Sequence, residues 1–332
     1  MSRARTLADY VSSGDELALK APIAGPTFTG TVAIPNVANL ETAVVANTAT
    51  YMVCAGDGTI TTEGDYKIHT FTGEGDFIVS SVGNSLGSNT VDYLMMGGGG
   101  SGGAVRGGGG GAGGCRTVVG ASMSAATYAI VIGDGGGTQS SVGNPVKGSD
   151  TTFAGQTTAY GGGGGGHEDQ AAHANINGGS GGGGCLSNAS PQVGGTGFSL
   201  RNGNASNQGN DGGDGIYGAP NYGAGGGGGA SGSGENGDDQ KGGDGGAGIN
   251  YQVGLTYVAV GGGGGGGQHS TGAQAGSASH GAGQGNILGA GNAGSANTGG
   301  GGGGGHGGSA TGVDQYGGAG GSGVVIIRYK FQ

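Results

Sequence analysis

The sequence has no tryptophan, few aromatic residues and few charges. Only 33% of its 332 residues are hydrophobic and 5% are aromatic, which is too little for an ordinary hydrophobic core in a chain of this length. Charged residues make up only 10%, so the high charge typical of disordered chains is missing as well. We therefore expect an ordered structure that depends little on the burial of apolar side chains.

What is missing also disfavours several classes of protein. The net charge is −10 and no basic cluster is present, which argues against binding to nucleic acid or to an anionic membrane surface. No segment is long and apolar enough to span a bilayer. Ser2-Arg3-Ala4-Arg5 does not lead into an apolar stretch, so we expect no signal peptide and synthesis in the cytoplasm. Three widely spaced cysteines, Cys54, Cys115 and Cys185, favour free thiols over a disulfide framework or a zinc site.

Glycine is abundant, with 97 residues, and only ten of them precede Gly97. The uninterrupted runs of four or more glycines are 97–100, 107–111, 161–166, 181–184, 225–229, 261–267 and 299–305. Such runs make poor α-helices and poor strands, because glycine loses the most backbone entropy on ordering. They suit either a flexible linker or an extended left-handed helix of the polyproline II kind. We favour an ordered lattice of such helices, whose backbone groups pair between neighbours that lack Cβ atoms.

Strand-like alternation defines a small β-module. Residues 66–71 and 77–79 flank a turn-prone stretch and predict a hairpin. Further strands are expected at 91–95, 128–132, 257–260 and 324–329. The predicted fold is therefore mostly β and irregular. It has an extended N-terminal attachment segment over 1–50, a β-module over 51–160 and 324–332 that includes the first glycine runs at 97–114, and a polyglycine II helix bundle over 161–323.

Charge sorts with position along this bundle. If the glycine-dense stretches alternate in direction, the loops between them fall into two sets. The first set, 167–177, 198–211, 230–241, 268–280 and 306–316, carries most of the charge of the bundle and all histidines after residue 100. The second set, 185–193, 216–222, 249–260 and 286–298, has no charged residue and is apolar. We expect the first set to form a free tip and the second set to rest on the β-module.

The candidate receptor-binding residues lie in the first set of loops. They are His167, Glu168, Asp169, His173, Phe198, Arg201, Asn204, Glu235, Asp238, Asp239, His269, His280, His306 and Tyr316. The histidines with nearby carboxylates suit either a metal ion or exposed contacts to a ligand, and we assign neither a metal nor a cofactor. No arrangement of nucleophile and base, and no pair of carboxylates, stands out, so we expect no enzyme.

Two parts of the chain resemble phage proteins. Residues 17–31 are similar to the linker near the N-termini of many phage tail-fibre and virion proteins. The layout from Tyr66 to Phe331, with Met96 running into the first glycines and the ending 320–329, resembles the glycine-rich domains of phage structural proteins. It is also similar to phage tail-tip adhesins whose receptor domain is a bundle of polyglycine II helices.

The resemblance implies a virion tail-fibre or tail-tip adhesin, made in the host cytoplasm. Residues 1–50 would join other tail or fibre proteins as a homotrimer, and the tip loops would bind a host cell-surface receptor, either a saccharide or an outer-membrane protein. A non-adhesive structural or decoration spike of the capsid or tail is the alternative. An ice-binding glycine-rich protein is a third reading, against which the charged, irregular loops argue.

Overall fold

The computed structural model describes residues 49–140, 144–168, 175–187, 190–198, 208–217, 222–253, 256–268, 273–307 and 316–332. Residues 1–48 lie outside the described residues. The attachment segment and its trimer therefore stay predictions. The described residues form antiparallel strands and extended glycine-rich segments, and none of them is in an α-helix.

Two antiparallel sheets enclose the hydrophobic core. In order across the sheet, the five-stranded one contains β2 (Thr59–Glu63), β3 (Tyr66–Phe71), β13 (Val324–Lys330), β5 (Thr90–Met96) and β6 (Cys115–Ser122). The four-stranded one contains β1 (Val53–Gly56), β4 (Gly75–Ser81), β7 (Ala126–Val131) and β8 (Thr152–Phe153). Phe77 contacts Phe153 and Tyr329 edge to face at ring-centroid distances of 6.2 and 6.1 Å, so aromatic rings fill the core.

The expected hairpin between residues 66–71 and 77–79 is wrong, although both strands exist. β3 pairs with β2 and β13, whereas β4 pairs with β1 and β7 in the other sheet. The turn between β3 and β4 carries the chain from one sheet to the other, so that Phe71 and Phe77 both enter the same core. Burial of the apolar face of each strand decides the pairing, and the alternation of residues does not reveal it.

A separate hairpin packs on the five-stranded sheet. It consists of β11 (Ile249–Val253) and β12 (Thr256–Val260). Val253 and Val260 join a second apolar cluster with Ile68, Met96 and Ile326 of the sheet. The expectation that 249–260 rests on the β-module is therefore confirmed.

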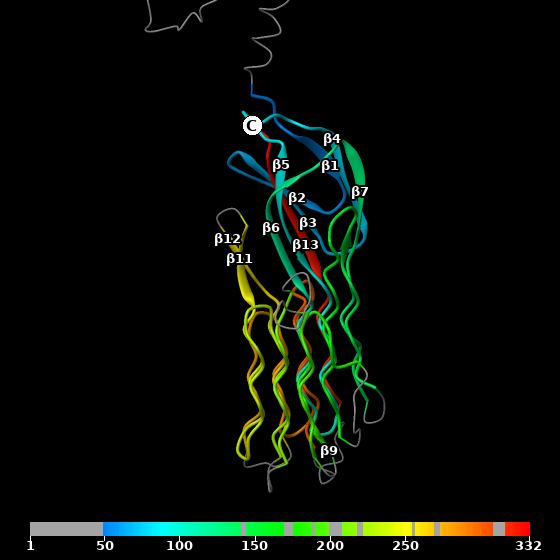
Figure 1. Ribbon diagram of the computed structural model, residues 1–332, viewed down its shortest axis with the longest axis vertical. Helices are drawn as coiled ribbons and strands as arrows, with labels where there is room; N and C mark the ends of the chain where they lie inside the picture. The colour runs from blue at the N-terminus through cyan, green and yellow to red at the C-terminus, as the bar shows by residue number, and fades with distance from the viewer. Residues whose placement is uncertain are drawn as a thin grey trace, which may run out of the picture. The chain divides into compact units, whose positions relative to one another are not determined.

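The glycine-rich segments leave the sheets and return to them (Figure 1). Segment 97–103 continues β5 away from the sheets, and segment 107–114 leads back into β6. Amides three residues apart in one segment donate to the same neighbouring segment. In 97–103 these bonds are Gly99 and Gly102 to Gly321 and Gly318 (2.9 and 2.8 Å), and Gly100 and Gly103 to Gly111 and Gly108 (2.9 and 2.8 Å). The hydrogen bonding thus has a three-residue repeat.

The uninterrupted glycine runs are the interior segments. Segment 107–114 exchanges backbone hydrogen bonds with neighbours on every side, namely 97–103, 160–166, 179–185, 223–230, 261–268 and 299–306. A Cβ atom on Gly109 would lie 1.9 Å from the carbonyl oxygen of Gly264. Where an interior run is interrupted, the residue is small and fully buried, as at Ser101 and Ala112. Only glycine and such residues allow this approach of backbones.

Segments of mixed composition form the outer layer, and they explain why the alternation of the loops was predicted incorrectly. Gly164 donates to Asn175 and Gly178 donates to Thr196 (2.9 and 3.2 Å), so residues 175–178 run back toward the sheets. Residues 179–185 then run away from them. In these outer segments, positions that face away from the interior have room for side chains. A search for glycine-dense stretches therefore does not recognise them as segments of the lattice. The region 178–184 therefore contains a reversal of the chain.

Several loops lie at the opposite end from the one expected. We call the end of the segments remote from the two sheets the distal end. It contains the turns at 104–106, 167–168, 185–187 with 190–191, 215–217 with 222, 238–241, 286–289 and 306–307. The strands β9 (Leu186–Ser187) and β10 (Ser190–Pro191) form a hairpin there (Figure 1). The expectation that 185–193, 216–222 and the first part of 286–298 rest on the β-module is thus wrong.

Candidate functional site at the distal end

The predicted site residues separate into two groups. His167, Glu168, Asp238, Asp239, His306 and Tyr316 lie at or beside the distal end, and Glu235 lies in the segment that leads there. Phe198 and His280 lie at the sheet end. Asp169, His173, Arg201, Asn204 and His269 are outside the described residues.

Phe198 and His280 are corrections to the predicted tip. The Phe198 ring contacts Tyr160 edge to face at 5.0 Å, where the chain leaves the sheets. The carbonyl of His280 accepts a bond from Gly262 at 3.3 Å, next to the end of β12. Both residues belong to extended outer segments, which we had predicted from the sequence to be tip loops. Each contacts a neighbouring segment close to the sheets.

The two histidines described at the distal end are buried. His167 and His306 are 4% and 3% exposed, so the interpretation of them as exposed ligand contacts is wrong. His167 Nδ1 donates to the Glu168 carbonyl at 2.6 Å, and the buried Cys185 thiol donates to the His167 carbonyl at 2.8 Å. Within the described ranges, no group of three or more His, Cys, Asp or Glu residues is arranged to hold a metal ion.

An ion pair and two tyrosines from separate turns meet at the distal end. Arg106 Nη1 lies 2.5 Å from Glu168 Oε1, with side chains only 18% and 15% exposed. The Arg106 guanidinium lies over the Tyr222 ring at 5.2 Å from its centroid. The Tyr222 ring lies 5.8 Å from that of Tyr217, which is 58% exposed. We call these four residues the tyrosine–arginine cluster.

The backbone of this cluster is strained. Val105, Arg106 and Tyr222 have φ angles of 45°, 55° and 51°, in the left-handed region that residues with a Cβ atom avoid. The Arg106 side chain lies directly over Gly307, where a Cβ atom would be 1.9 Å from Arg106 Cγ. The sequence offered one signal for this arrangement, the lone Val105-Arg106 pair between two glycine runs. Glu168 and Tyr222, the residues that contact Arg106, come from distant turns, and their separation in the sequence does not predict the contact.

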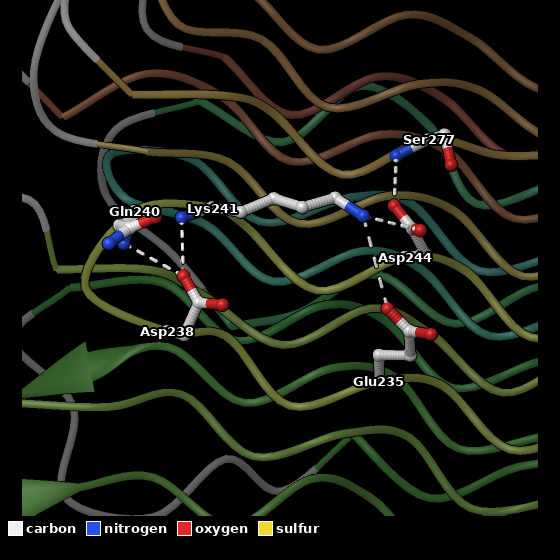
Figure 2. Close-up of polar contacts among 6 residues, drawn as sticks. All are labelled: Glu235, Asp238, Gln240, Lys241, Asp244 and Ser277. Carbon is white, nitrogen blue, oxygen red and sulfur yellow. Dashed lines mark hydrogen bonds and ion pairs between the residues drawn. The ribbon is translucent and has the colours of Figure 1, made fainter.

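A second polar cluster surrounds Lys241 (Figure 2). Lys241 Nζ lies 2.5 Å from Asp244 Oδ2 and 3.9 Å from Glu235 Oε2. Asp238 Oδ1 accepts the amides of Gln240 and Lys241 at 2.7 and 2.6 Å, which closes the turn. Burial alone would raise the pKa of Asp244, but the hydrogen bonds from Lys241 and Ser277 outweigh it and lower the pKa. These carboxylates hold the turn and its neighbouring segments in place.

Carboxylates also satisfy amides of the outer layer. Asp214 Oδ1 accepts the Gly194 amide and Asp211 Oδ1 accepts the Gly197 amide, both at 2.8 Å. In the interior, the same kind of amide donates to a neighbouring glycine carbonyl. The side chains thus replace a missing neighbouring segment at the surface. Asp211 and Asp214 are explained by this structural role.

These features define a protein with two packed β-sheets from which a lattice of glycine-rich segments extends to a set of turns. The chain belongs to a family described as the glycine-rich domain, whose model matches residues 71–330. None of the curated proteins compared with the chain matches it. In the part of the chain that the structure describes, no helix is long and apolar enough to cross a membrane.

Proposed function

We propose that this protein is a phage fibre or tail-tip adhesin that binds a host cell-surface receptor through its distal end. One observation carries the proposal. Turns from distant parts of the chain converge at the end remote from the sheets and expose large apolar side chains there. Tyr217, Leu288 and Val193 are 58%, 51% and 74% exposed. Turns on a rigid scaffold suit recognition, because they can vary without disturbing the scaffold.

The scaffold, in this proposal, is a bundle of polyglycine II helices. The three-residue repeat of hydrogen bonds supports it, because that helix has three residues per turn. Among the described glycines after residue 96, positive φ occurs only at Gly120, Gly155, Gly261, Gly281 and Gly299, so within the runs it is confined to the first residues of 261–267 and 299–305, as an extended helix with negative φ requires. Backbone angles determined by experiment should cluster near about −75° and +145°. Most run residues lying outside that region would contradict the assignment.

The attachment of the protein to the virion rests on resemblance. Residues 1–50 are proposed to join other tail or fibre proteins as a homotrimer, with the protein made in the host cytoplasm and assembled into the virion. A monomeric mass of the full-length protein at micromolar concentration would contradict the trimer.

Cell binding by the full-length protein tests the adhesive function. Fluorescent protein is incubated with a panel of bacterial isolates, and unlabelled protein serves as competitor. We expect saturable, competed binding to a subset of the isolates. Failure to bind any isolate, including one that the phage infects, would overturn the adhesin.

A non-adhesive structural spike is the second candidate. The burial of His167 and His306 supports it, because side chains that pack inside the distal end do not contact a receptor. In that case antibodies against the protein would label virions, while the purified protein would neither bind cells nor block adsorption.

A further inference from the structure

We propose that the tyrosine–arginine cluster binds an uncharged sugar ring of a cell-surface glycan, with Tyr217 as the stacking platform. The inference rests on the proposed adhesive function and names the chemical class of its receptor. The cluster combines the exposed Tyr217 ring, a second tyrosine ring behind it, an ion pair that packs against that second ring, and a strained backbone, all contributed by different turns of the distal end.

The aromatic part of the site is supported from behind. Tyr217 is 58% exposed, yet its ring contacts Tyr222 at 5.8 Å with an interplanar angle of 57°. Tyr222 is in turn covered by the Arg106 guanidinium at 5.2 Å. Tyrosine has few side-chain torsions, so a ring held on one side loses little entropy on binding. An open, amphipathic face of this kind suits the C–H face of a pyranose ring.

The polar part of the site favours a neutral ligand. The charges of Arg106 and Glu168 cancel at 2.5 Å, so the pair attracts neither anions nor cations strongly. The net charge of −10 on the whole chain further disfavours an anionic glycan.

The backbone conformation indicates that this arrangement is fixed before binding. Among the described residues other than glycine, positive φ occurs at Val105, Arg106, Tyr222, His280 and Asn297. Three of these five belong to this one region. Strained residues of this kind persist where surrounding contacts hold them and often mark binding sites. Here the close packing of Arg106 on Gly307 supplies such a contact.

The sheets contain a related set of residues that serves as an internal control. Arg328 pairs with Asp92 at 2.7 Å and lies over the Tyr66 ring at 4.7 Å. These residues join neighbouring strands, and no second tyrosine ring is stacked on Tyr66 among the described contacts. Both sets therefore have an arginine that contacts an acidic side chain and a tyrosine ring. The set in the sheets lacks the distal position and has no counterpart of Tyr217.

Saturation-transfer NMR of the full-length protein tests the site with methyl α-D-glucopyranoside, methyl α-D-galactopyranoside and methyl α-D-mannopyranoside. We expect transfer to the ring protons of at least one glycoside. Tyr217→Ala should lower that signal at least fivefold, whereas Tyr66→Ala should leave it within twofold of the unaltered protein. Absence of transfer from all three glycosides, or equal signals for Tyr217→Ala and the unaltered protein, would overturn the inference. Since Tyr217 is exposed, its substitution should not prevent folding, and Gly307→Ala provides a second perturbation by displacing Arg106.

Cell binding separates this inference from the adhesive function on which it rests. Mild periodate treatment of the bound isolate should remove most binding if a glycan is the receptor. If the protein still binds treated cells, and Tyr217→Ala weakens that binding, the receptor is a protein: the saccharide inference fails and the adhesin stands. If no isolate is bound at all, the adhesive function itself fails.

Discussion

The amide of Gly264 donates to the carbonyl of Gly110 at 2.9 Å, although the two residues belong to glycine runs far apart in the sequence. A Cβ atom on Gly264 would lie 2.1 Å from the carbonyl oxygen of Gly302 in a third run. The interior of the lattice therefore depends on direct backbone contact between several runs. This relationship explains why the longest glycine runs are the ones that lie inside.

Alanine substitutions should separate interior from outer glycines. Gly264→Ala forces the backbone apart and should lower the free energy of unfolding by about 1–3 kcal/mol or more. Gly137→Ala is the matched control, because Gly137 lies in an outer segment with nothing within 4 Å of the added Cβ atom. It should leave stability unchanged or raise it by up to about 1 kcal/mol. Urea unfolding measures both variants, and equal effects would contradict the close-packed interior.

Each outer-layer carboxylate should stabilise the fold through its hydrogen bond to a backbone amide. Asp214→Ala leaves the Gly194 amide without its acceptor and should cost about 1–3 kcal/mol. Asp214→Asn retains a side-chain oxygen and should cost less. Glu74→Ala, at an exposed turn of the sheets, should have little effect. If Asp214→Ala behaves like Glu74→Ala in urea unfolding, Asp214 does not have the structural role assigned here.

His69 should make the stability of the sheets depend on pH. It is fully buried between the sheets, 5.2 Å from the Phe77 ring, and burial lowers its pKa. Below about pH 6.5 the unfolded chain binds a proton at this histidine while the folded chain does not. Stability should therefore fall as the pH drops through that value, by at most about 1.4 kcal/mol per pH unit from this residue.

His69→Leu isolates this contribution from the other histidines. The difference in unfolding free energy between the two proteins should change between pH 7 and pH 5 in favour of the variant. Parallel pH profiles would show that His69 is not the group responsible.

Phe198 should matter for stability and not for adsorption. Its edge-to-face contact with Tyr160 lies at the sheet end, so Phe198→Ala should lower the melting temperature while folded protein binds cells as before. If Phe198→Ala has normal stability but does not bind cells, Phe198 belongs to the receptor-binding site, as we had predicted from the sequence.

The strands were the part of the fold most accessible from sequence. The predicted bounds 66–71 match β3, and the predicted 324–329 falls within β13, because alternation and β-branched residues mark them. Partner choice was not accessible. β3 pairs with β13 from the far end of the chain, and only burial of both sheet faces selects that pairing.

The distal site was predicted only in part. Glu168 and the turn at Asp238 were placed at the tip correctly, since charge gathers in the turns. Phe198 and His280 were misplaced, because outer segments can carry side chains and so resemble loops in composition. Arg106 and Tyr222 were missed for a related reason. Their contact joins two turns that are far apart in the sequence. Both turns can be placed at the distal end only when the direction of every segment is known.

Adsorption by a matched pair of leucine variants tests the central claim most directly. Leu288 lies in a distal turn and is 51% exposed, whereas Leu86 lies in a turn of the sheets and is 56% exposed. Leu288→Asp and Leu86→Asp therefore make the same chemical change at similar exposure and opposite ends. If the distal end binds the receptor, Leu288→Asp should weaken binding to cells at least tenfold, and Leu86→Asp should leave it within twofold. Equal binding by the two variants, or loss only in Leu86→Asp, would contradict a distal receptor site.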